Sequence, residues 1–200
     1  MRWGRRGTVA AVVVAFTAVT VLGSGVRITG HHGEVEAGDT SLAVQRDDGR
    51  TWQVVPFEPG TTAVVEFEVE HRGALPVTLV GLTDSRARGA VDCGWNPEHA
   101  TAEGEGGDGT VGTPLPEGVE LRRGDRLTIT VRGEFVGEPG CLVDGQVSAR
   151  PTFLADVSVL GLRHRQRLQP PRVLAWSTDP AEVAERWTHV PVAPRVGTVP

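Results

Sequence analysis

The residues that decide the fold are Thr62–Leu82, which read TAVVEFEVEH, then RGALP, then VTLVGL. In the first run, apolar side chains alternate with mostly acidic ones, as expected of a strand with one buried face. A short break containing Gly73 and Pro76 follows, and a second β-branched run begins at Val77. This stretch predicts a strand, a tight turn and an antiparallel return strand. The buried face of the first strand should carry Ala63, Val65, Phe67 and Val69.

The same alternation recurs at Arg126–Phe135, where Leu127, Ile129, Val131 and Phe135 share a face. Shorter apolar runs predict further strands at Leu42–Val44, Trp52–Phe57, Val119–Leu121, Gln146–Ala149, Phe153–Leu160 and Arg163–Leu168. Many short strands joined by Gly and Pro turns, with little helix, predict an all-β fold. We expect an antiparallel immunoglobulin-like (Ig-like) β-sandwich, with a small barrel as the alternative.

The N-terminus predicts a membrane segment. Basic residues among positions 1–6 precede an uncharged run from 7 to 26. Eighteen helical residues cover roughly 27 Å, about the thickness of the hydrocarbon core of a bilayer. The positive-inside rule then makes 1–6 a cytoplasmic flank, 7–26 a transmembrane signal anchor and the remaining chain extracytoplasmic. The alternative is a cleaved signal peptide and a secreted protein.

The remaining boundaries follow from composition. Residues 27–39 are polar and predict a linker, and the sandwich is expected over 40–169. Residues 99–118 contain almost no large apolar side chain, which predicts a flexible insertion in the sandwich. Residues 170–200 are Pro-rich, and the capping pattern at Asp179 predicts a short helix at 180–187. This segment, with Trp176 and Trp187, either docks on the sandwich or forms a contact with a partner.

One pattern in the chain resembles a known group of proteins. Its parts are Pro59-Gly60, the strand to His71, Arg72-Gly73, Pro76-Val77-Thr78-Leu79, and later Arg126–Cys141 and Val157–Arg163. Over residues 55–168 the chain resembles uncharacterised actinobacterial membrane-anchored or secreted proteins that have an Ig-like β-sandwich ectodomain. It departs from them at His71, where Asn is usual. The resemblance implies the fold and the location, and it brings no catalytic residues with it.

The two cysteines, Cys93 and Cys141, predict a disulfide in an oxidising compartment. This bridge would close a loop of nearly fifty residues and stabilise the fold by about 4 kcal/mol in the chain-entropy account. It would also tether the predicted insertion on both sides. A reactive thiol is the alternative, and it would need a depressed pKa, for which no neighbouring residue in the sequence provides a reason.

Two groups of residues could in principle bind a metal ion. Adjacent imidazoles at His31-His32 suit Cu²⁺ or Zn²⁺, but neighbouring residues of an extended chain point apart. Glu103, Glu105 and Asp108 suit Ca²⁺, but the closing bidentate Glu of an EF-hand is missing. We therefore predict no metal site and no cofactor. The other histidines are expected to be hydrogen-bonded or loop residues: His71, His99, His164 and His189.

Glu66, Glu68 and Glu70 form a row on one strand face. Alternate carboxylates lie roughly 7 Å apart, a separation that some glycosidase pairs use. A solvated outer face produces the same pattern, and we prefer that interpretation. The row could pair with Arg126 and Arg132 if the two strands are neighbours.

No motif for a nucleophilic elbow, a phosphate-binding loop, a dinucleotide fold or a zinc protease occurs in the chain. The formal charge of −5 argues against nucleic-acid binding. The sequence therefore predicts a non-catalytic, membrane-anchored extracytoplasmic module, not an enzyme, with a protein-interaction or envelope-associated role. Its partners would be the membrane and an envelope protein. The alternative is an envelope protein that binds a small ligand or a metal.

Overall fold

The computed structural model describes residues 25–37, 41–46, 49–83, 93–105, 113–114, 118–138 and 140–188. The expected cytoplasmic flank and almost all of the expected membrane span lie outside these residues, as do Asp108 and His189. No helix in the described ranges combines the length and the apolar character needed to cross a bilayer.

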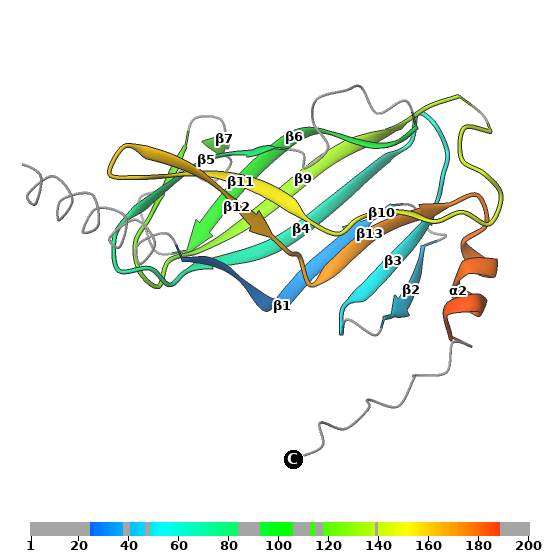
Figure 1. The fold of residues 1–200 in the computed structure, drawn as a ribbon, viewed down its shortest axis with the longest axis horizontal. Helices are drawn as coiled ribbons and strands as arrows, with labels where there is room; N and C mark the ends of the chain where they lie inside the picture. The colour runs from blue at the N-terminus through cyan, green and yellow to red at the C-terminus, as the bar shows by residue number, and fades with distance from the viewer. Residues whose placement is uncertain are drawn as a thin grey trace, which may run out of the picture.

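The described residues form mostly antiparallel β-sheet with one short C-terminal helix (Figure 1). Sheet A has the order β1-β4-β9-β6-β7, sheet B the order β10-β13-β3-β2, and sheet C the order β12-β11-β5-β8. The strands are β1 (Val26–Glu36), β2 (Leu42–Gln45), β3 (Thr51–Pro56), β4 (Thr62–His71), β5 (Val77–Thr83), β6 (Gly94–Glu105), β7 (Thr113–Pro114), β8 (Val119–Leu121), β9 (Arg126–Val136), β10 (Ser148–Arg150), β11 (Phe153–Val159), β12 (Leu162–Leu168) and β13 (Arg172–Ser177), and the helix is α2 (Pro180–Thr188).

One hydrophobic core lies between sheet A and the other two sheets. The predicted inward faces of β4 and β9 are both buried in it. Phe67 of β4 stacks on Phe153 of β11, with ring centroids 5.3 Å apart, and this contact joins sheet A to sheet C. Phe135 of β9 contacts Trp176 of β13 at 5.7 Å and joins sheet A to sheet B. The result is a sandwich-like arrangement of two layers.

The predicted hairpin between β4 and β5 is wrong. β4 pairs with β1 and β9, whereas β5 pairs with β11 and β8. The connection at 72–76 therefore carries the chain from one layer to the other. Alternation shows which face of a strand is buried, but both layers bury a face in the same core, so the pattern does not identify the neighbouring strand.

Two segments expected to lack regular structure form strands. Residues 26–36, which comprise the last residue of the expected span and most of the expected linker, form β1 along β4. Gly33 permits this, because a Cβ there would lie 2.9 Å from Cγ of Pro171. Residues 99–105, within the expected insertion, belong to β6 and pair with β9. Pairing of the backbone orders this segment without large side chains, since Ala102 alone is deeply buried in its described part.

The sheets also extend beyond the boundary expected at residue 169. β13 pairs in parallel with β3 and fills the middle of sheet B, after the two prolines at 170 and 171. α2 then packs its buried Val183 beside Val44 and Val54. Trp187 lies 5.4 Å from Trp52, so the C-terminal segment docks on the sandwich.

Candidate functional site

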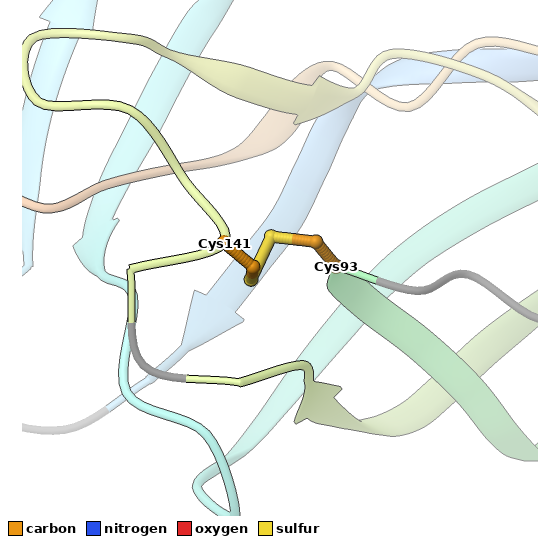
Figure 2. Close-up of a disulfide and its surroundings, with 2 residues drawn as sticks. All are labelled: Cys93 and Cys141. Carbon is orange, nitrogen blue, oxygen red and sulfur yellow. A yellow bond between two sulfur atoms is a disulfide. The ribbon is translucent and has the colours of Figure 1, made fainter.

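The structure joins Cys93 and Cys141 in a disulfide, with Cα atoms 5.8 Å apart (Figure 2). Cys93 immediately precedes β6, and Cys141 follows β9 in a loop. Gly94 pairs with Val136, so the bridge lies where β6 begins and β9 ends. It ties the two strands together at the end of the sandwich opposite to the start of β1.

The histidines and carboxylates weighed as metal ligands in the sequence lie partly in two strands of sheet A. His31 and His32 lie in β1 and Glu103 and Glu105 in β6, but their side chains lie outside the described ones. Among described residues, no group of three His, Cys, Asp or Glu side chains could hold a metal ion. His71 is fully buried, and its Nε2 donates to the carbonyl of Leu75 at 2.7 Å.

The row of glutamates in β4 lies beside the predicted arginines. Glu70 faces Arg126 across β4 and β9, and Nε of Arg126 lies 3.5 Å from Oε1 of Glu68. Arg132 lies opposite Val64 instead. The hydrogen bond from Arg72 lowers the pKa of Glu70. Glu66 is exposed, but the side chains of Glu68 and Glu70 are only 15% and 17% exposed, so the row is an ion-paired outer face that is solvated in part.

A basic surface, absent from our sequence predictions, lies on β12, which is a terminal strand of sheet C. Arg163, Arg165 and Arg167 are all exposed and alternate along one face. Arg165 Nε donates to Oδ1 of Asp156 on β11 at 3.0 Å. No ion pair of Arg163 or Arg167 occurs among described residues. We call these three residues the arginine row.

At the arginine row, the backbone N–H and C=O groups of β12 also face the open edge of sheet C. Leu160 and Gly161 both have positive φ, 51° and 82°, and form the two-residue turn between β11 and β12. In such a turn, the backbones of Val159 and Leu162 form hydrogen bonds with each other. Hydrogen-bonded and non-hydrogen-bonded residue pairs then alternate along the two strands. The N–H and C=O groups of the arginine row consequently point away from β11.

The turn itself carries an exposed apolar tip. Leu160 is 65% and Leu162 42% exposed. The turn type strongly favours Gly, which has no Cβ, or Asn, whose short polar side chain can form a local hydrogen bond at positive φ, whereas leucine is strained there. The sequence signals were present: Leu-Gly separates two strands, and LRHRQRL alternates basic residues. These patterns indicate a binding edge only if β12 is a terminal strand of its sheet, and the sequence does not show that position.

Comparisons with known proteins add no relative: no protein-family model matches the chain, and no curated protein sequence matches it. The candidate site therefore stands on the geometry of β12 alone.

Proposed function

We propose that this protein is a non-catalytic, Ig-like recognition module, held outside the cytoplasm by a membrane anchor at residues 7–26. The disulfide between Cys93 and Cys141 supports an oxidising compartment, because such bridges persist mainly outside the reducing cytosol. The uncharged N-terminal run behind a basic flank supports the anchor.

In this proposal, the open edge of β12 is the surface that binds the partner. An extended segment of a partner protein adds to this edge as a further strand, and its backbone bonds to the outward N–H and C=O groups of the arginine row. Directly opposed residues of paired strands share a face. The partner segment therefore carries Asp or Glu at every second position, about 7 Å apart, facing Arg163, Arg165 and Arg167.

Photo-crosslinking of the full chain in its native membrane tests this function. A photoreactive residue replaces Arg167, and a matched control replaces Thr128 on the outer face of β9. We expect capture only from position 167, through a partner peptide with alternating acidic residues. Reversal of the other two charges, Arg163→Glu with Arg165→Glu, should reduce this capture about tenfold or more.

Equal capture from both positions, or capture insensitive to charge reversal, would contradict strand addition. The arginine row would then serve only to keep sheet edges of different molecules apart, which is a common role of charged residues on edge strands.

A further inference from the structure

The tip of the β11–β12 hairpin combines exposure, apolar character and strain. Leu160 and Leu162 are two of the few large apolar side chains exposed among the described residues. Leu160 also has a left-handed backbone, with φ of 51°. Asn at this position would favour both folding and solubility more than leucine does, so neither of them explains the leucine. Strain at an exposed position is a reason to look for a binding role.

Unpaired positive charge surrounds this tip. Arg163 follows it directly, and Arg123 is exposed in the turn between β8 and β9. Among described residues, neither has an ion pair. The nearby described carboxylates are engaged, since Glu70 accepts from Arg72 at 3.0 Å, Glu120 lies 3.5 Å from Arg122 and Asp125 accepts from the amide of Arg122 at 2.8 Å. Arg163 and Arg123 are therefore two exposed positive side chains at this end that have no ion pair among the described residues.

The tip lies at the end of the sandwich where β1 begins. Val26 pairs with His71, the last residue of β4. β5 starts shortly afterwards, and its Thr78 pairs with Ser158, close to the turn of the β11–β12 hairpin. The carbonyl of Gly25 accepts from the amide of Arg72 at 3.0 Å, which fixes the chain there. Figure 1 shows the start of β1 and the hairpin turn toward the same side of the molecule.

We propose that this tip docks on the surface of an anionic phospholipid bilayer. Leu160 and Leu162 enter the boundary between headgroups and acyl chains, and Arg123 binds lipid phosphates. The arginine row (Arg163, Arg165 and Arg167) remains available to the partner strand.

This inference rests on the proposed anchor. The expected span ends at residue 26 and β1 begins at Val26, so no linker separates the bilayer from the sheet. An anchored sandwich must then face the bilayer with the end that carries the tip. The opposite end of the sandwich is suited to face solvent, because it carries the disulfide and exposed carboxylates. These carboxylates are Glu58, Glu138 and Asp144.

Hydrogen exchange of the full chain in lipid nanodiscs tests the docking. One set of nanodiscs contains about a third phosphatidylglycerol, and the other contains only phosphatidylcholine. We expect amides of residues 160–163 to exchange about fivefold more slowly in the anionic discs. Amides of the turn at 58–60, at the opposite end, serve as the internal reference and should not change.

The matched variant is Leu160→Asn with Leu162→Ser. Asn suits the turn, so the fold should be retained while the apolar tip is removed. We expect the variant to lose the slowing of exchange in anionic discs. Equal exchange in both lipids, or slowing that the variant retains, would overturn the docking while leaving the anchor intact.

Failure of the anchor has a separate signature, which is that the full chain does not co-purify with nanodiscs of either kind. In that case, flotation of the protein with vesicles of the same two compositions decides the docking. Flotation with anionic vesicles alone, abolished by the double variant, would support it. No flotation would overturn it.

Discussion

Gly133 of β9 lies directly beneath the indole of Trp95. A Cβ on residue 133 would stand 2.7 Å from Cε2 of Trp95 and even closer to the carbonyl oxygen of Asn96. The missing side chain lets the fully buried indole cross β9, and its Nε1 donates to the carbonyl of Ala63 on β4 at 3.3 Å. The close approach therefore joins three strands of sheet A.

The substitution Gly133→Ala should destabilise the fold by about 3 kcal/mol, because neither the backbone of β6 nor the packed indole can move away cheaply. Urea denaturation measures the loss. The control is Gly81→Ala in β5, where a Cβ would meet nothing within 4 Å, and we expect it to be nearly neutral. Similar losses in both variants would contradict the role of close packing.

The substitution Leu160→Asn alone should stabilise the protein by about 1 kcal/mol, because it relieves a left-handed conformation that is unfavourable for leucine. Removal of an exposed apolar side chain has little opposing effect. The opposite change in the same turn, Gly161→Ala, introduces a Cβ at φ of 82° and should destabilise. Thermal melts of both variants check the pair, and a loss of stability in Leu160→Asn would show that the leucine supports the fold.

The double variant Cys93→Ala with Cys141→Ala should lose about 4 kcal/mol of stability, since the bridge closes a loop with a sequence separation of 48. Replacement of both residues avoids a free thiol in the variant. Reduction of the native protein should produce a comparable shift of the urea midpoint. The bridge itself predicts no alkylation of folded protein without reductant, and labelling of both thiols under those conditions would contradict it.

The sequence predicts the burial of strands better than their pairing. In β4 and β9, every second side chain is apolar, so the alternation alone identifies the buried residues. It does not identify the neighbouring strands, because the alternation is the same in both layers. β1 was missed because its apolar pattern is interrupted by glycine and histidine, and β13 because it follows two prolines.

The candidate site was the least predictable part. The basic alternation of Arg163, Arg165 and Arg167 is visible in the sequence, but the same pattern inside a sheet would only form cross-strand pairs. Its open backbone depends on the position of β12 at an edge, and that position results from the contacts of strands distant in the sequence. The exposure of Leu160 was missed for a similar reason, since a leucine in a strand run normally predicts core.

Arg150 of β10 is a buried cation whose contacts lead to a pH-dependent prediction. Its Nη2 donates to the carbonyl of Trp95 at 2.9 Å, its guanidinium lies 5.9 Å from the Trp95 ring, and burial lowers its pKa to about 10. Arginine still remains charged at pH 7, so the folded protein contains a desolvated charge there.

The substitution Arg150→Lys brings this effect into an accessible pH range. The lysine ammonium has an ordinary pKa of about 10.4, and the same burial should lower its pKa in the folded state. Below that lowered pKa the folded protein must bury the charge, so the variant should be less stable than the wild type at pH 7. As pH rises from the lowered pKa toward the unfolded value, the unfolded state binds more protons, so stability is gained. Urea midpoints of both proteins between about pH 6 and 10 should therefore converge with increasing pH, whereas a constant difference would show that the loss comes from packing alone.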